Sequence, residues 1–224
     1  MTRDIRTLII AIDGPSGAGK GTVARALAAT LQFQHIDTGA MYRAVAWRAM
    51  RESVPLADET TLAVIARDAI FAFVDGRVLI DGHDVTAAIR TPEMDAAAAS
   101  VARLPQVRAA LVARQRAYGE AGGVVMEGRD IGTVVFPDAD VKLYLDASAE
   151  ERARRRAQDT AHTASRDNGG VANIAQALAA RDQSDRTRTV SPLTLAEDAI
   201  YLDTTGLSIE DVVDRALAAV RAGR

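Results

Sequence analysis

Short apolar runs recur along the chain, and each is bounded by turn-forming or charged residues. Runs of this length that are rich in Val, Ile and Leu are typical of strands buried on both faces of a parallel sheet. The pattern predicts strands at 7–12, 33–36, 124–126, 141–145 and 199–202.

Helical patterns follow several of these runs. Ser148 and Ser208 stand where an N-cap is needed, and acidic residues occupy the turn that follows each of them. The clearest helices are predicted at 22–31, 149–158 and 208–221. Strands that alternate with helices predict an α/β fold, in which helices cover both faces of a central parallel sheet.

The segment 71–85 breaks this alternation. It contains two Asp-Gly pairs, at 75–76 and 81–82, between short apolar runs, which is a strong hairpin signal. We therefore expect a small antiparallel insertion within a mostly helical segment from about 40 to 118.

Composition narrows the function classes. The 224 residues are 48% hydrophobic and 25% charged, with a formal net charge of −3, which does not suggest a general nucleic-acid or membrane-surface binder. No apolar stretch approaches the length that crosses a bilayer. Cysteine is absent, which excludes disulfides and cysteine-based metal sites and fits a cytoplasmic protein. Only Lys20 and Lys142 are lysines, so arginine supplies nearly all the positive charge.

The strongest motif lies between the first predicted strand and the first predicted helix. Glycines let a backbone curl around a phosphate, and the following helix adds its positive N-terminal end. Lys20 would place its charge on the β- and γ-phosphates of a nucleotide. The strand–loop–helix context predicts a nucleotide-phosphate site made of Gly14, Pro15, Ser16, Gly17, Ala18, Gly19, Lys20, Gly21 and Thr22.

The motif departs from the usual loop at one position. Gly21 follows the lysine where Ser or Thr is usual, so a direct magnesium contact by Thr22 stays open. The alternative interpretation is a tight turn with a solvated Lys20, which the strand, the helix and the spaced glycines disfavour. The sequence has no guanine-reading Asn-Lys-x-Asp segment, which argues against a nucleotide switch.

A second candidate segment, 37–43, follows the predicted strand at 33–36. Ligands of open α/β sheets bind at the carboxyl ends of the strands, and this segment offers Thr38, Tyr42 and Arg43 there. The alternative is an ordinary helix face with Tyr42 packed and Arg43 solvated.

The segment 127–133 follows another predicted strand and carries Arg129 and Asp130 side by side. The functional interpretation places Arg129 on an acceptor phosphate and Asp130 on a base or sugar. The alternative is a surface ion pair on a turn, which contributes little energy.

Two arginine-rich helical segments complete the candidates. Arg181, Asp185 and Arg188 fall on one helix face, which predicts either a phosphate clamp or a salt-bridged solvent face. Further cations for a transferring phosphoryl group would come from Arg152, Arg154, Arg155 and Arg156, several of which must be plain surface arginines.

The four segments 14–22, 37–43, 127–139 and 181–188 together resemble those of bacterial cytidylate kinases. Their order and spacing agree over nearly the whole chain, including the hairpin insertion. The resemblance implies a P-loop nucleoside monophosphate kinase fold in a single chain, 1–224. It implies a core of about 1–38, 105–158 and 190–224, a monophosphate-binding region of about 39–104 with a β insertion at 70–86, and a lid at about 159–172.

The resemblance also implies the reaction ATP + (d)CMP ⇌ ADP + (d)CDP with Mg²⁺, in pyrimidine nucleotide metabolism. It implies catalytic roles for Lys20, Arg129, Arg155 and Arg181. Arg43, Arg129 and Arg181 are expected at the acceptor phosphate, and Asp185 and Arg188 at the cytosine and sugar. The whole cytidylate site would consist of Thr38, Tyr42, Arg43, Arg108, Arg129, Asp130, Arg181, Asp185 and Arg188.

Three positions depart from this family pattern. Thr38 stands where relatives often have Ser, and Glu127 stands where Asp is common. A serine of the family that contacts the base aligns with Ala99, while Ser100 lies one residue further on.

Phosphoryl transfer to a phosphate requires alignment, charge neutralisation and exclusion of water, so we expect no protein nucleophile. His35, His83 and His162 are scattered and show no metal-ligand spacing. The stretch 160–171 is expected to close over the site. A monomer is expected.

Three rival functions remain open from the residues alone. One is a kinase of the same fold that acts on UMP, another nucleotide or shikimate. Another is a binding-only nucleotide sensor, which would not need so many arginines for a second phosphate. The third is a ribonucleoprotein role, against which the acidic balance argues.

Overall fold

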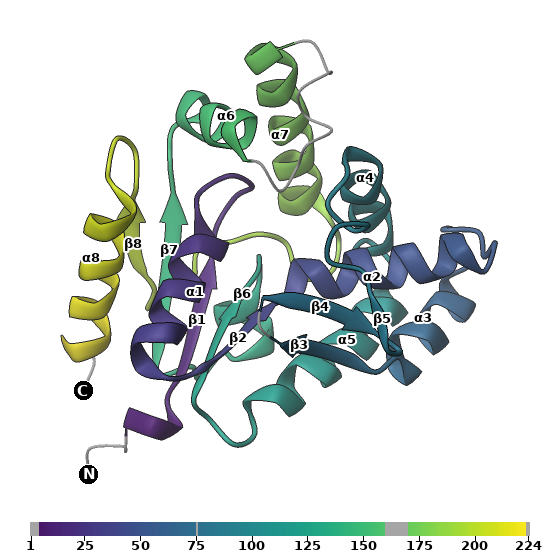
Figure 1. Cartoon of the computed structure of the whole chain (residues 1–224), viewed down its shortest axis with the longest axis horizontal. Coiled ribbons are helices and arrows are strands. Elements are labelled where there is room, and N and C mark those ends of the chain that lie inside the picture. The colour runs from purple at the N-terminus through teal and green to yellow at the C-terminus, as the bar shows by residue number, and fades with distance from the viewer. Residues whose placement is uncertain (1–4, 75, 160–169, 223–224) are drawn as a thin grey trace.

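Five parallel strands form the central sheet of the computed structural model, which describes residues 5–74, 76–159 and 170–222. They are β1 (Ile9–Asp13), β2 (Gln34–Asp37), β6 (Val124–Glu127), β7 (Val141–Asp146) and β8 (Ile200–Asp203), in the order β2-β6-β1-β7-β8. The predicted α/β fold with a parallel sheet is confirmed (Figure 1). The first strand begins later than predicted, because Ile5–Thr7 forms a short 3₁₀ turn.

Side chains of β1 alternate between the two faces of this sheet. Ile10 and Ile12 join a core formed with α1 (Lys20–Leu31) and α8 (Ile209–Ala222). Ala11 points to the opposite core, which includes residues of α2 (Thr38–Arg51) and α5 (Pro105–Gly119). The sheet is thus buried on both faces, which explains why its strands read as continuous apolar runs.

The segment between β2 and β6 is mostly helical, as predicted. Besides α2 and α5 it contains α3 (Glu59–Asp68), which packs on α5, and α4 (Pro92–Val101), which packs on α2. The second core is built largely from this region.

The predicted antiparallel insertion is confirmed as a second, three-stranded sheet of β3 (Phe71–Val74), β4 (Arg77–Ile80) and β5 (His83–Asp84). Asp81 and Gly82 connect β4 to β5, and both have positive φ, 50° and 78°. Two consecutive positive φ values are typical of the tight hairpin turn that Asp-Gly favours.

Two helices, α6 (Ala149–Gln158) and α7 (Gly170–Thr187), pack against each other beyond the carboxyl edge of the sheet (Figure 1). The Ser148 side chain accepts a hydrogen bond from the Glu151 amide and caps α6, as predicted. Most of the expected lid, 160–169, lies outside the described residues. No helix in the part of the chain that the structure describes is long and apolar enough to span a membrane.

Ser208 caps α8 as predicted, because its hydroxyl accepts a hydrogen bond from the Asp211 amide at 3.1 Å. We expect Ser208→Ala to lower the free energy of unfolding by about 1 kcal/mol, measured by urea denaturation. Ser100→Ala is the control, because the Ser100 hydroxyl is exposed and bonds only within its own helix, to Ala96. An equal loss in the free energy of unfolding for both variants would contradict the capping role of Ser208.

Candidate functional site

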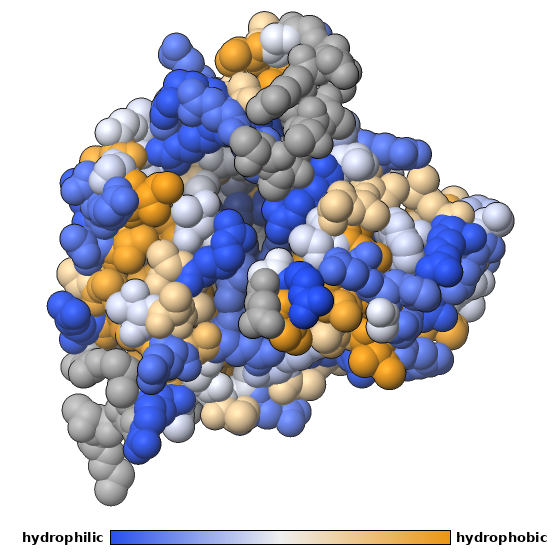
Figure 2. All heavy atoms as spheres, viewed as in Figure 1, coloured by the Kyte–Doolittle hydropathy of each residue, from blue (hydrophilic) through white to orange (hydrophobic). Residues whose placement is uncertain are grey.

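A cavity of about 710 Å³ lies at the carboxyl edge of the parallel sheet. Figure 2 shows a hollow there, lined by hydrophilic residues between the core and the α6–α7 pair. The walls come from the glycine loop, the start of α2, the segment after β6, and helices α6 and α7. Parallel strands bring these distant segments to one edge, because each strand delivers its following loop there.

The glycine loop curls between β1 and α1, and residues 16–22 line the cavity. Gly14 has φ 143°, and a Cβ there would overlap the Leu145 carbonyl oxygen. Gly17 has φ 80° and sits against the backbone of Arg152. These two glycines let the loop turn tightly beneath α6, and other residues would not fit without strain.

Lys20 is buried, and its Nζ donates a hydrogen bond to the Pro15 carbonyl at 2.8 Å. Burial, and then the charge of Arg129, lower the pKa of Lys20 from 10.5 to about 7. The alternative of a solvated lysine is therefore wrong. A bound phosphate would stabilise the charged form of this amine and raise its pKa.

All nine residues predicted for the acceptor line the same cavity. Arg129 and Asp130 do not pair with each other, so the alternative of a surface ion pair is wrong. The Nε of Arg129 donates to Asp185 at 2.8 Å. Asp130 instead accepts hydrogen bonds from Arg108 and from Arg188.

Asp185 and Arg188 are both buried, so the alternative of a solvent-facing stripe is wrong. Their charges lie close together, with 3.6 Å between Arg188 Nη1 and Asp185 Oδ1. The cavity wall thus carries two carboxylates and three guanidinium groups that are joined by a chain of ion pairs.

Tyr42 and Arg43 are also buried, which contradicts the alternative of a solvated Arg43. The guanidinium of Arg108 lies over the Tyr42 ring, 5.5 Å from its centroid. Arg43 donates to Asp37 at 3.0 Å, and Asp37 caps α2 through the Ala40 amide. The Nε atoms of Arg43 and Arg108 are buried without a hydrogen-bond partner among the described residues.

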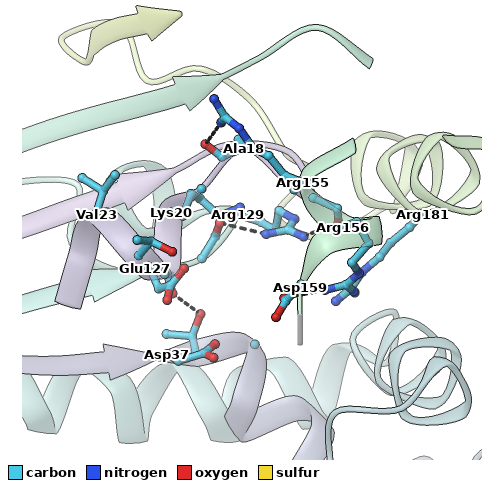
Figure 3. A pocket seen from close by; sticks show the side chains of 18 of the residues that line it. Ala18, Lys20, Val23, Asp37, Glu127, Arg129, Arg155, Arg156, Asp159 and Arg181 are labelled. Carbon is cyan, nitrogen blue, oxygen red and sulfur yellow. Dashed lines mark hydrogen bonds and ion pairs between the residues drawn. The ribbon is translucent and has the colours of Figure 1, made fainter. Parts of the chain in front are cut away.

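The four arginines of α6 have different environments. Arg152 is held by Asp182 and the Ser16 carbonyl, so it supports the glycine loop from outside the cavity. Arg155 lines the cavity and donates to Thr204 and Ala18 (Figure 3). Arg156 points toward Arg181, while Arg154 is 54% exposed and pairs with Glu151.

The sequence interpretation gave no role to Glu127 and Asp13, two acidic residues close to the glycine loop. Glu127 Oε1 lies 3.2 Å from His35 Nε2 and accepts a hydrogen bond from it when this nitrogen carries the proton. The same Oε1 would lie 2.9 Å from a Cβ at position 21. Gly21 therefore leaves room for this carboxylate beside the phosphate loop. Of the other histidines, His83 is exposed in β5 and His162 lies outside the described residues.

Asp13 is the second such residue. Its carboxylate accepts hydrogen bonds from the amides of Ile131 and Gly132, at 2.8 and 2.7 Å. These bonds fix a short π-helical turn, Ile131–Val135, directly after Asp130. Burial raises the pKa of Asp13 to about 6, despite both hydrogen bonds.

Ala99 lines the cavity, whereas Ser100 is exposed. The Ser100 hydroxyl bonds the Ala96 carbonyl of its own helix. The structure thus agrees with the alignment that placed Ala99, and not Ser100, at the serine position of the family.

Comparison with known sequences decides the family. The profile described as cytidylate kinase matches residues 10–222 of this chain. The chain belongs to the cytidylate kinase family. The resemblance inferred from the four motifs is confirmed.

Two curated cytidylate kinases illustrate the similarity. The chain is 49% identical to that of Desulfitobacterium hafniense over 216 residues, covering 95% of this chain and 92% of the relative. It is 48% identical to that of Solibacter usitatus over 217 residues, covering 97% and 94%. Shikimate kinase from Acinetobacter baumannii shares the fold, with a TM-score of 0.51 and 17% identity over 98% of this chain and 97% of that structure.

The raised pKa of Asp13 implies that the stability of the protein depends on pH. Because its folded pKa, about 6, exceeds the ordinary value of 3.8, its contribution to stability is lost as pH rises through this window. We expect the stability of Asp13→Asn relative to wild type to rise by about 2 kcal/mol between pH 4 and pH 7, measured by urea unfolding.

Asp58→Asn is the matched control. Hydrogen bonds from Thr61 lower the pKa of this exposed carboxyl, so the stability of this variant relative to wild type should change in the opposite direction with pH. A pH-independent difference between wild type and Asp13→Asn would show that Asp13 has an ordinary pKa.

Proposed function

We propose that this chain transfers the γ-phosphoryl group of ATP to CMP and dCMP, producing ADP and the corresponding diphosphates. The observation that carries the proposal is a single cavity with two cationic ends. One end is the glycine loop with Lys20, and the other is the group of guanidiniums that includes Arg43, Arg129 and Arg181. A donor and an acceptor phosphate could meet between them.

The donor end suits a triphosphate. The glycine loop and the first turn of α1 line the cavity, and the amides of such a loop and helix N-terminus favour anions. Arg155 lies beside Ala18 and Thr204 at the same end. We assign Lys20 and Arg155 to the donor phosphates.

The acceptor end suits a cytidine monophosphate. Arginine forks match the oxygens of a phosphate, which supports Arg43, Arg129 and Arg181 as its ligands. Cytosine offers an amino donor that a carboxylate accepts, whereas uracil has an oxygen there. Asp130 and Asp185 supply carboxylates that could accept from this amino group. Arg108 and Arg188 form ion pairs with Asp130, and their guanidiniums could donate hydrogen bonds to the base or sugar.

Magnesium is part of the proposal. Magnesium is usually held by one or two carboxylates together with substrate phosphates, and Thr22 and Glu127 line the cavity beside the loop. These residues fit such an ion, which would neutralise charge on the β- and γ-phosphates. Among the described residues, no three acidic or histidine side chains form a protein-only metal cage.

The reaction needs no protein nucleophile, so the residues of this chain act by position and charge. The glycine loop would fix the donor, and the guanidiniums would orient the acceptor oxygen and stabilise the charge of the transferred group. The division into core, monophosphate-binding region and lid belongs to the same proposal. A monomeric state and a cytoplasmic location remain predictions.

Acceptor preference tests the proposal. We would measure ADP release with ATP and Mg²⁺ and compare kcat/KM for CMP, dCMP, UMP, AMP and shikimate. CMP and dCMP should be far better acceptors than the others. Fast turnover of shikimate or AMP alone would favour a different small-molecule kinase, and no turnover would overturn the assignment.

Arg188→Met tests the base contact. Loss of a charged hydrogen bond should lower kcat/KM for CMP by roughly 10- to 100-fold and narrow the preference for CMP over UMP. Arg67→Met is the matched control, because Arg67 is 65% exposed and pairs with its neighbour Asp68. An unchanged ratio of CMP to UMP would remove Arg188 from base selection.

The lowered pKa of Lys20 leads us to expect that the protein takes up a proton when ATP binds. At pH 8 an amine with a pKa of about 7 is mostly neutral, and binding of the triphosphate should protonate it. Calorimetry in buffers of different ionisation enthalpy should show uptake that approaches one proton per site at pH 8 and vanishes near pH 6. Lys20→Arg, which stays charged, should abolish the uptake, and uptake that persists in this variant would assign it elsewhere.

A further inference from the structure

A carboxylate that the sequence interpretation did not use lies among the arginines of the acceptor end. Asp95 is in the first turn of α4. Its Oδ1 lies 2.9 Å from Arg181 Nη1 and 3.7 Å from Arg43 Nη1. Its Oδ2 accepts a hydrogen bond from Arg156. One side chain therefore connects α4 with α2, α6 and α7.

These guanidiniums belong to the cavity and are largely shielded from water. The side chains of Arg43, Arg156 and Arg181 are only 11%, 18% and 18% exposed, and all three line the cavity. Figure 3 shows Arg156 and Arg181 pointing toward the same place from α6 and α7. Three cations so close together repel one another unless an anion lies between them.

The electrostatics identify Asp95 as that anion. Burial, then the charges of Arg129 and Arg43, lower the pKa of Arg181, while Asp95 acts in the opposite direction. Burial likewise lowers the pKa of Arg156, and Asp95 again opposes the change. A carboxylate presents two oxygens to guanidinium forks in nearly the same way as a phosphate does.

We propose that Asp95 competes with the phosphate of the acceptor for Arg43, Arg156 and Arg181, and so sets the affinity of this chain for its acceptor. The proposal rests on the proposed function, because Arg43 and Arg181 are the residues assigned there to the acceptor phosphate. A phosphate that enters the cluster meets the negative charge of Asp95, so the carboxylate must yield at least part of its contacts. Acceptor binding then loosens the connection between α4 and the α6–α7 pair.

The test compares Asp95→Asn with wild type by calorimetry, using CMP, cytidine and inorganic phosphate as separate ligands at constant ionic strength. Asparagine keeps the shape of aspartate and removes the competing charge. CMP and inorganic phosphate should bind at least about fivefold more tightly to the variant, whereas cytidine, which lacks the phosphate, should bind equally to both. In steady state, KM for CMP should fall without a rise in kcat.

Glu93→Gln is the matched control. Glu93 lies in the same first turn of α4, is exposed, and loses the same charge on substitution. It should bind all three ligands as wild type does. Asp95→Glu, which keeps the anion, should also resemble wild type, and it serves if Asp95→Asn does not fold.

Weaker or unchanged binding of CMP and phosphate by Asp95→Asn would overturn the proposal and make Asp95 a support that holds the arginines in place. If Glu93→Gln also binds CMP and phosphate fivefold more tightly, the effect follows from the loss of one negative charge on α4 and not from the position of Asp95, and the proposal is overturned. Inorganic phosphate separates this proposal from the proposed function. If CMP is not an acceptor, phosphate should still bind more tightly to Asp95→Asn than to wild type. Phosphate bound at the glycine loop would contribute equally to both proteins, so the difference would report on the arginines around Asp95.

Discussion

The constraint on which this structure depends is positive charge on arginine side chains that are largely buried in the cavity wall. A buried guanidinium without a counter-charge costs several kcal/mol, so each one must meet an anion or a strong acceptor. Asp130 forms ion pairs with Arg108 and Arg188, and Asp185 forms one with Arg129. Asp95 lies among three further arginines. In the proposed function, a phosphate at the acceptor end would have to compete with Asp95 for the arginines around it.

The parallel sheet is what makes this concentration of charge possible. Strands β1, β2 and β6 end at one edge, and each passes directly into a polar segment: the glycine loop, the start of α2 and the residues 127–130. Helices α6 and α7 add their arginines from beyond that edge. Rigid strands beneath the site hold the charged groups in register, which favours phosphoryl transfer by alignment over transfer through a protein nucleophile.

Two parts of the site are poised for the arrival of phosphate. The pKa of Lys20, about 7, leaves its charge sensitive to a neighbouring anion. At the other end, the buried Nε of Arg43 has no hydrogen-bond partner among the described residues. A donor at one end and an acceptor at the other would each supply the negative charge and the hydrogen-bond acceptors that these groups favour. Asp95 would make the second of these steps an exchange of one anion for another.

The sequence by itself determined the features that depend on neighbouring residues along the chain. Apolar runs indicated the strands, Ser148 and Ser208 indicated helix starts, and two Asp-Gly pairs indicated the small sheet. The glycine loop indicated where a phosphate site is proposed. Only the tertiary structure decided which charges meet. Arg129 pairs with Asp185, 56 residues away, and not with the adjacent Asp130. Arg154 and Arg156 lie two residues apart on the same helix, but the side chain of Arg154 is 54% exposed and that of Arg156 only 18%. Charge pairing depends on distance and burial in three dimensions, and these exist only after the strand ends and the helices have packed together.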